Sequence, residues 1–295
     1  MFAQAIQFPD IGRELFSFEI GGFTLALRYY ALAYIIGILI GWRLIVRALK
    51  TKRLWANDTP PMTPTQLEDL MTWIIIGIIV GGRLGFVFFY QPAFFWENPI
   101  EIPMVWQGGM SFHGGFLGVI FATWWFARRH KLVIASVADA MAFAAPAGLL
   151  LGRLSNFVNA ELWGRPSDVP WAVIFPGGRA QDCPGVEDLC ARHPSQIYEA
   201  GLEGLILGAI LLVLVWRYDW LKIPGQIAGL FFAGYGSARF FVEFYRQADP
   251  QFITPDNPLG YVIGSGSFGM SMGQLLSLPM ILIGIGVIVW ARRRA

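Results

Sequence analysis

Charged residues are scarce in this sequence. Only 14% of its 295 residues are Asp, Glu, Lys or Arg, whereas 55% are hydrophobic and 15% are aromatic. Soluble domains usually carry about 25% charged residues. A chain this apolar either buries nearly all of its surface or uses lipid as the solvent for its outer face. Its net charge of +2 gives no basic groove for nucleic acid, so we expect no nucleic-acid partner.

Cysteine and histidine are rarer still. Cys183 and Cys190 lack the spacing of a metal site, and no histidine accompanies them closely enough to complete one. An oxidising compartment would permit a disulfide between them, and the sequence leaves a disulfide and two free thiols open. The chain also lacks an HExxH motif and a phosphate-binding P-loop, and we expect neither a metal nor another cofactor.

Long apolar runs are what the sequence has in abundance. A helix that crosses the hydrocarbon core needs about 20 largely apolar residues. We therefore predict an all-α integral membrane protein of about seven transmembrane helices, forming one polytopic domain over residues 1–295. An extracytoplasmic loop region is expected at 155–197, between the fourth and fifth helices. The predicted spans are 23–44, 67–90, 112–127, 137–154, 198–216, 226–244 and 273–290.

Basic residues gather after every second predicted span, as in Arg128-Arg129 after the third and Arg292 to Arg294 after the seventh. Cytoplasmic loops carry the excess of Lys and Arg in membrane proteins. The amino terminus is therefore expected outside and the carboxyl terminus in the cytoplasm. Acidic residues precede the first apolar run, so we predict that it is not a cleaved signal peptide.

Ionisable side chains within the spans fall near one level. Counted from the predicted orientation, Arg83, His113, Arg153, Arg239 and Glu243 all lie toward the outer ends of their spans. Charge inside a membrane is costly and usually marks a functional site. Structural ion pairs would not need to share a depth, so this level is the predicted site.

Tyr235, Arg239 and Glu243 follow each other at a spacing of four residues, which places them on one helical face. The structural interpretation is an ion pair within the helix, and for Glu243 it weighs as much as a functional one. The arginines favour function. With few carboxylates nearby, we expect uncompensated positive charge that suits a phosphate or carboxylate ligand.

Two glycine-bounded segments carry further candidates. His113 lies in GGMSFHGG (108–115), and it is the leading candidate for a general base, ahead of a structural anchor. The segment GRLSNFVNAELWG (152–164) combines Arg153 with Asn156, Asn159 and Glu161. Alone, each would be a turn former or a solvated charge; together they indicate a site for a lipid headgroup or a transition state.

Three other carboxylates favour structural roles. Asp139 lies near the cytoplasmic start of the fourth span, where a helix dipole stabilises negative charge. Glu199 and Glu203 share a face of the fifth span, and we expect His193 and Gln196 to cap or orient that helix.

With these residues in view, the chain resembles the bacterial phosphatidylglycerol:prolipoprotein diacylglyceryl transferase family over nearly its whole length. One departure is Ser155, where the family usually has Gly or Ala; serine is small, so we expect little loss. The motifs that carry the resemblance are GGR at 81–83, GMSFHGG at 109–115, the segment at 152–164, RHPSQIYE at 192–199, GYG at 234–236 with Arg239 and Glu243, and SMGQ at 271–274.

The resemblance implies transfer of the diacylglyceryl group of phosphatidylglycerol to the lipobox cysteine of a prolipoprotein signal peptide, with glycerol phosphate leaving. It implies a multi-pass protein of the bacterial cytoplasmic (inner) membrane, with its active site on the extracytoplasmic side. Without a cofactor, His113 would activate the thiol and Arg153 and Arg239 would hold the phosphate. The residues expected to bind the headgroup are Tyr30, Arg83, Asn156, Glu161, Tyr235 and Glu243.

Two rival functions remain as alternatives. A lipid or small-molecule transporter would need repeat symmetry and polar groups near the bilayer centre, and the sequence has neither. An intramembrane protease would need paired Asp residues or a Ser–His pair within the spans. Asp139 is alone, and Ser237 has no evident partner other than His113.

Overall fold

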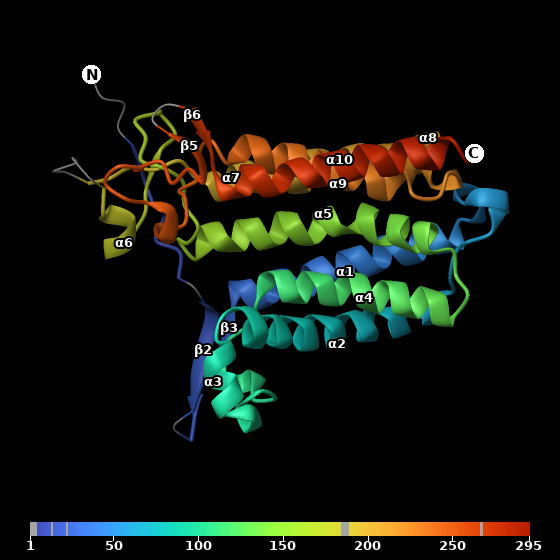
Figure 1. Cartoon of the computed structure of the whole chain (residues 1–295), viewed down its shortest axis with the longest axis horizontal. Coiled ribbons are helices and arrows are strands. Elements are labelled where there is room, and N and C mark those ends of the chain that lie inside the picture. The colour runs from blue at the N-terminus through green and yellow to red at the C-terminus, as the bar shows by residue number, and fades with distance from the viewer. Residues whose placement is uncertain (1–4, 13, 22, 184–188, 266–267) are drawn as a thin grey trace.

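The computed structural model describes residues 5–12, 14–21, 23–183, 189–265 and 268–295. Most of them form helices that run side by side along the long axis of the molecule (Figure 1). The long helices are α1 (Tyr29–Lys50), α2 (Pro64–Phe89), α4 (Phe112–Arg129), α5 (Ile134–Val158), α7 (Ser195–Glu199) with the π-helix (Ala200–Ile206) and α8 (Leu207–Tyr218), α9 (Gln226–Val242) and α10 (Met272–Arg292).

Within the described ranges, five helical segments are long and apolar enough to cross a membrane. They are α1, α2, α5, the continuous segment Ser195–Tyr218 and α10. The shorter helices α4 and α9 are not among them, so the count of seven spans stays a prediction. Its long apolar helices make the chain a predominantly helical membrane protein.

Side-chain caps fix where several helices begin. Thr63 and Gln66 form a reciprocal capping box at the start of α2, and Ser271 and Gln274 form another at the start of α10. The Ser111 hydroxyl accepts from the Gly114 amide at the start of α4. Each cap satisfies amides that have no partner within their own helix.

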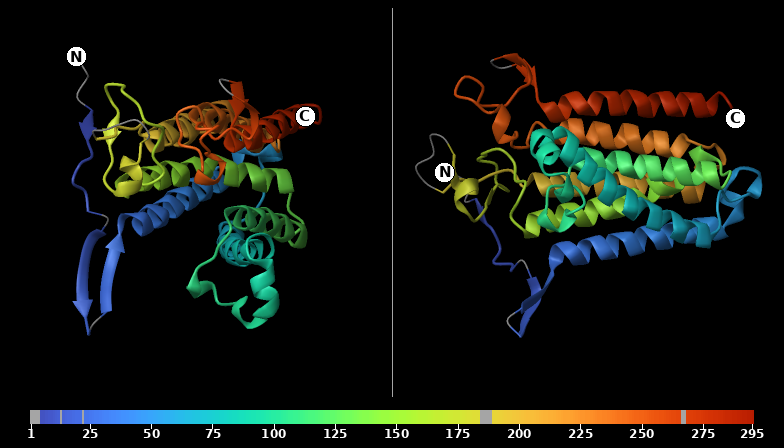
Figure 2. Two further views of the ribbon diagram at one scale, coloured as in Figure 1. Left: turned by 60° about the vertical axis from the view of Figure 1, so that its left-hand side comes forward. Right: turned by 60° about the horizontal axis from the view of Figure 1, so that its bottom comes forward.

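The strands and short helices mark one end of the bundle, and the carboxyl terminus lies at the other (Figure 1). Strands β2 (Glu14–Ile20) and β3 (Phe23–Arg28) form an antiparallel hairpin that extends away from the helices (Figure 2). The same end of the molecule holds β1 (Ile6–Gln7) paired parallel with β4 (Val173–Ile174), β5 (Ile263–Ser265) paired with β6 (Phe268–Met270), and the short helices α3 (Pro92–Glu97) and α6 (Gly178–Gln181). The remaining short elements are 3₁₀ turns at Lys52–Leu54, Ala56–Asp58, Pro99–Glu101, Val105–Gln107, Trp220–Lys222 and Pro250–Phe252.

Two predicted boundaries were wrong. The first span was predicted from residue 23, but 23–28 form β3 and the helix begins at Tyr29. A short apolar stretch such as 23–28 can form a strand as well as the start of a helix. Here it forms a strand because it pairs with β2. The fourth helix continues to Val158 rather than ending near 154, which places Asn156 inside its last turn.

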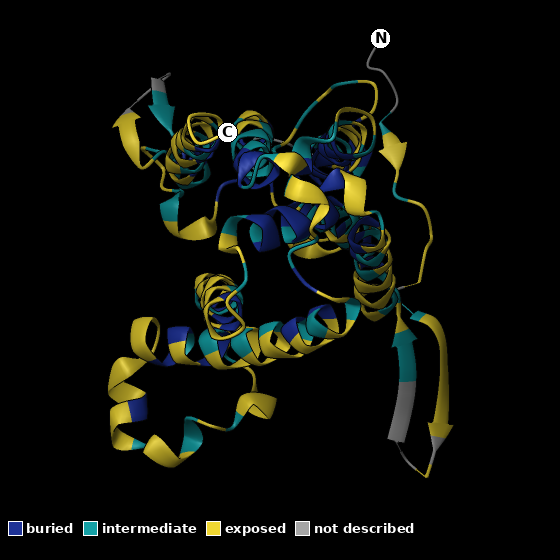
Figure 3. Cartoon of the chain, turned by 90° about the vertical axis from the view of Figure 1, so that its right-hand side faces the viewer, coloured by how far each residue is buried: buried dark blue, intermediate teal, exposed yellow. Residues whose placement is uncertain are grey.

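The apolar core lies between the helices, toward the end of the bundle that holds the carboxyl terminus (Figure 1). Leu67, Phe126, Phe143, Leu211 and Ile227, from five different helices, are almost completely buried there. Many large apolar side chains instead cover the outer faces, where Figure 3 colours long stretches of helix as exposed. Apolar surface on this scale is typical of helices that face lipid.

Candidate active site

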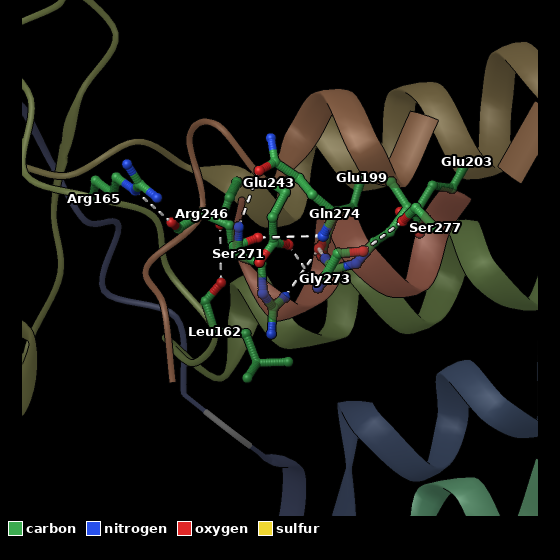
Figure 4. A network of polar contacts seen from close by, with 12 residues as sticks. Leu162, Arg165, Glu199, Glu203, Glu243, Arg246, Ser271, Gly273, Gln274 and Ser277 are labelled. Atoms are coloured by element: carbon green, nitrogen blue, oxygen red, sulfur yellow. Dashed lines mark hydrogen bonds and ion pairs between the residues drawn. The ribbon is translucent and has the colours of Figure 1, made fainter. Parts of the chain in front are cut away.

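Six charged side chains meet where α5, α7, the π-helix and α9 come together, at the end of the bundle opposite the carboxyl terminus (Figures 1 and 4). They come from elements far apart in the sequence. We call them the arginine–glutamate cluster: Arg153, Glu199, Glu203, Arg239, Glu243 and Arg246.

Glu199 is the centre of this cluster. Its carboxylate is completely buried. The oxygen Oε1 accepts from Arg239 Nη1 at 2.7 Å and from Arg246 Nη1 at 2.9 Å, and Oε2 lies 3.1 Å from Arg153 Nη1. Because charge-assisted hydrogen bonds are the strong ones, one carboxylate fixes three guanidinium groups relative to each other.

The other two carboxylates complete the cluster. Arg239 Nη2 lies 2.8 Å from Glu243 Oε2, which confirms the ion pair within α9. Arg153 Nη2 lies 3.5 Å from Glu203 Oε2. The expectation that Arg153 and Arg239 would have few carboxylates nearby was therefore wrong, since each contacts two. Glu199 and Glu203 had been assigned structural roles, and Arg246 had not been singled out.

The segment after α5 folds around Glu161, which contacts two of the amides that the sequence analysis grouped with it. Asn156 Nδ2 donates to Glu161 Oε1 at 2.8 Å, and Asn159 Nδ2 donates to the same oxygen at 3.3 Å. The side chain of Gln196, at the start of α7, donates to the Glu161 carbonyl at 2.6 Å. We expected Gln196 to cap or orient its own helix, but its side chain links α7 to this segment and α7 has no side-chain cap.

Two tyrosines border the cluster. Tyr235 lies beside Arg153, one helical turn before Arg239 on α9. Tyr30, in the first turn of α1, shares a hydrogen bond of 2.8 Å with the Tyr34 hydroxyl and lies within electrostatic range of Arg153 and Glu161. These residues from α1, α5 and α9 gather at one end, consistent with the predicted level.

Arg83 and His113 belong to the neighbouring hairpin of α2 and α4. Arg83 is 5% exposed, and its side chain donates to the carbonyls of Glu101 at 2.6 Å and Ile102 at 2.8 Å. It also donates to the carbonyl of Gly108 at 2.5 Å and lies over the ring of Phe95. Its donors hold the loop that leads to α4, and no contact found among the described residues joins it to the cluster.

His113 is exposed in the first turn of α4, with its ring against Phe112. Figure 1 places the start of α4 at the same end of the bundle as the cluster. Over the described part of the chain, no hydrogen bond or ion pair links His113 to Arg153 or Arg239. Its role as a base therefore stays a prediction.

Beyond the helices, Arg192 organises the loops around the cluster. It is 2% exposed and donates to the carbonyls of Ala180 at 2.6 Å and Asp182 at 2.9 Å, and it lies over the Trp163 ring. The disulfide between Cys183 and Cys190, which the sequence left open, closes the same region.

Next to Arg192, His193 shares a hydrogen bond of 3.0 Å between its Nδ1 and the Tyr198 hydroxyl. Trp171 Nε1 donates to that hydroxyl at 2.7 Å, so the hydroxyl proton is free to point at His193. Burial lowers the pKa of His193 below its usual value, and the charge of Asp168 opposes this. His193 is thus held as a neutral acceptor.

No group of three or more His, Cys, Asp or Glu side chains that could hold a metal ion occurs within the ranges that the structure describes. The arginine–glutamate cluster offers guanidinium donors, which suit an anionic oxygen ligand.

A family model described as prolipoprotein diacylglyceryl transferase matches residues 16–290 of the sequence. The chain belongs to the prolipoprotein diacylglyceryl transferase family. Among its relatives, the phosphatidylglycerol–prolipoprotein diacylglyceryl transferase of Roseobacter denitrificans is 62% identical over 98% of this chain and 99% of its own length. The enzyme of the same name from Ruegeria pomeroyi is 61% identical over 97% of each chain. That of Brucella canis is 45% identical over 99% of this chain and 95% of its own. The resemblance noted in the sequence is confirmed.

Proposed function

We propose that this chain transfers the diacylglyceryl group of phosphatidylglycerol to the lipobox cysteine of a prolipoprotein. The family and the names of its full-length relatives support this activity. The observation in the structure that carries it is the half-buried set of guanidinium groups, held by buried carboxylates, at one end of a set of apolar helices. The products are a thioether and glycerol phosphate, and the reaction is the first step of lipoprotein maturation.

In this reaction, sulfur forms a bond to a glycerol carbon while that carbon's bond to a phosphate oxygen breaks. The electron pair of the broken bond stays on the oxygen, and the thiol proton passes to a base. A thiol reacts as its thiolate, so a base near the acceptor cysteine is needed. The leaving phosphate is best stabilised by cations fixed in advance in a site with little water.

Arg153 and Arg239 are the residues that we propose to hold the phosphate. Both contact the same carboxylate, Glu199, at 3.1 and 2.7 Å, so a single phosphate group can reach both. Asn156 and Tyr235 then supply hydrogen bonds to the headgroup.

The remaining proposed roles are less direct. Glu161 and Glu243 orient the amides and arginines that they contact, and Tyr30 borders the headgroup site from α1. His113 activates the thiol, and its exposed position leaves it open to a peptide substrate. Because the donors of Arg83 end on backbone carbonyls, we propose that it supports the loop before His113 rather than binding the headgroup.

We also propose the orientation that the sequence predicted, with seven spans in a bacterial cytoplasmic membrane and the cluster toward the outside. The basic residues after α1, α4 and α10 lie at the end of the bundle with the carboxyl terminus (Figure 1). The disulfide lies in the loops at the other end, as expected for an oxidising compartment.

The proposal is tested with purified protein, headgroup-labelled phosphatidylglycerol and a peptide that carries a lipobox cysteine. We expect labelled glycerol phosphate and a thioether-linked peptide in equal amounts. Arg239→Ala and His113→Ala should each abolish both products while the protein still inserts into membranes. Unchanged thioether yield in either variant would refute the role assigned to that residue.

The same assay separates the rival functions. A lipid transporter would move phosphatidylglycerol without releasing glycerol phosphate, and a protease would cleave the peptide without adding lipid. Either result with the wild-type protein would overturn the proposed transfer.

A further inference from the structure

Glu203 is a buried carboxyl group that the proposed reaction does not use. It lies in the π-helix one turn beyond Glu199, and its residue has no exposed surface. Within the described ranges, neither of its carboxyl oxygens has a hydrogen-bond partner. Among the residues that the structure describes, its ion-pair contact is the one with Arg153 at 3.5 Å. In Figure 4 it lies farther along the helix than Glu199, on the side away from Glu243 and Arg246.

The neighbouring carboxylates have closer cations, although Oε2 of Glu199 and Oε2 of Glu243 also lack a hydrogen-bond partner among the described residues. Glu199 contacts three guanidinium groups at 2.7 to 3.1 Å, and Glu243 contacts one at 2.8 Å. A buried carboxylate without hydrogen bonds or a close cation is costly, and such a group is cheaper when neutral. Of the three, Glu203 is therefore the one that best keeps a proton.

The surroundings of Glu203 prevent it from finding solvent. A Cβ on its neighbour Gly204 would lie 2.6 Å from Leu150, so the π-helix packs backbone to backbone against α5. The ionisable groups within electrostatic range are Arg153, Glu199, Tyr235, Arg239 and Arg246. The like charge of Glu199 disfavours ionisation of Glu203, since both carboxyl groups share Arg153.

The protonation state of Glu203 sets the charge of the whole cluster. With all groups ionised, the three arginines face three carboxylates and the cluster is neutral. With Glu203 neutral, three guanidinium groups face only Glu199 and Glu243. One positive charge is then left without compensation, which equals the single negative charge of a phosphodiester.

We propose that Glu203 is protonated in the folded protein and thereby leaves the arginine–glutamate cluster with the one net positive charge that receives a phosphodiester headgroup. This inference rests on the proposed function, because it names what makes the same site attract its anionic lipid. Glu203 is thus a positioning residue, and it acts on the lipid through Arg153.

The test compares Glu203→Gln with Glu199→Gln, which make the same chemical change one turn apart. Glutamine is close in shape to a protonated glutamate and is likewise uncharged, so Glu203→Gln keeps the proposed charge of the cluster and should lower the rate of transfer by much less than Glu199→Gln does. Glu199→Gln removes a charge-assisted contact to three arginines and should lower the transfer rate by at least about tenfold. A fall in the transfer rate of Glu203→Gln as large as that of Glu199→Gln would overturn the proposal.

Infrared spectroscopy supplies a second readout that does not depend on activity. Protein labelled with ¹³C-glutamate should show the carbonyl stretch of a protonated glutamate, shifted in heavy water, and Glu203→Gln should remove it while Glu199→Gln keeps it. The label separates this band from any band of the buried Asp139. Absence of a labelled band in the wild-type protein would overturn the proposal, even where a variant fails to fold. If the wild type forms no thioether, the proposed function fails, yet the band still decides the state of Glu203.

Discussion

Arg153 in α5 and Arg83 in α2 are both arginines near the outer ends of predicted spans, and their surroundings are opposite. Arg153 contacts the carboxylates of Glu199 and Glu203. Among the described residues, the partners to which Arg83 donates are all backbone carbonyls of the loop between Glu101 and Gly109. A phosphate can replace a carboxylate as the partner of an arginine, but it cannot replace carbonyls whose loop would then be left unsatisfied. Burial and charge alone therefore do not distinguish an arginine that binds ligand from one that builds a loop.

The two regions also differ in how they are assembled. The cluster joins α5, α7, the π-helix and α9 through side chains, so its geometry depends on several helices at once. The hairpin of α2 and α4 is held by local contacts within one stretch of sequence. We expect changes near the cluster to act on the reaction and changes in the hairpin to act first on stability.

Among substitutions outside the charged residues themselves, Gly273→Ala should have the largest effect, because the added methyl group would displace Glu243 from Arg239. A Cβ at Gly273, in the first turn of α10, would lie 2.5 Å from the Glu243 carboxyl group. Glu243 would have to move away from Arg239, and a lost charge-assisted contact costs about 1.5–3 kcal/mol. We expect kcat/KM for thioether formation to fall about ten- to hundredfold.

The control for this substitution is Gly286→Ala on the same helix, where a Cβ would meet nothing within 4 Å. It should leave kcat/KM and thermal stability unchanged. Equal activity of the two variants would mean that the position of Glu243 does not matter for the reaction.

Arg83→Gln tests the other side of the comparison. Removing the guanidinium leaves several backbone carbonyls without donors, and we expect a loss of about 2–4 kcal/mol in stability. Thermal unfolding in detergent measures this loss, with Arg128→Gln, an exposed arginine of α4, as the control. In the protein that remains folded, KM for phosphatidylglycerol should stay near the wild-type value. A raised KM with normal stability would instead make Arg83 a headgroup ligand.

The sequence predicted what depends on local spacing. The apolar helices, the ion pair of Arg239 with Glu243 and the grouping of Asn156 with Glu161 all follow from residues within one helix or one segment. Such contacts are set by helical geometry before any helix meets another.

What the sequence did not predict depends on which helices become neighbours. Glu199 lies on a different predicted span from both Arg153 and Arg239, and periodicity showed only that it shares a face with Glu203. Arg246 lies beyond the end of α9 and outside the predicted span 226–244, so it was not among the charged residues taken as site candidates. The strand at 23–28 likewise needed its partner to be recognised. Pairing between distant segments is the information that a single sequence does not display.

Asp139→Asn should have a smaller effect, on folding alone. The Asp139 carboxylate is buried in α5 and accepts from the amides of Gly225 at 2.6 Å and Ala228 at 2.7 Å, at the start of α9. It thus caps the start of a neighbouring helix, whereas the sequence analysis had assigned it to the start of its own helix. Asparagine keeps one acceptor oxygen, so we expect a cost of about 1–2 kcal/mol. The yield of folded protein should fall while activity per folded molecule stays normal; lost activity at normal stability would contradict this role.

Mild acidification should have the smallest effect, and it should be confined to the loops around His193. Because burial lowers the pKa of His193 in the folded protein, the unfolded chain takes up a proton first as the pH falls below about 6.5. The stability that the neutral imidazole contributes is therefore fully present above this pH and is lost as the pH drops through the lower, folded value. Hydrogen exchange should show faster opening of the segment around Tyr198 and Trp171 at acidic pH, with the amides of α9 less affected. His193→Gln should remove this pH dependence, whereas an unaltered profile in that variant would assign it to another group.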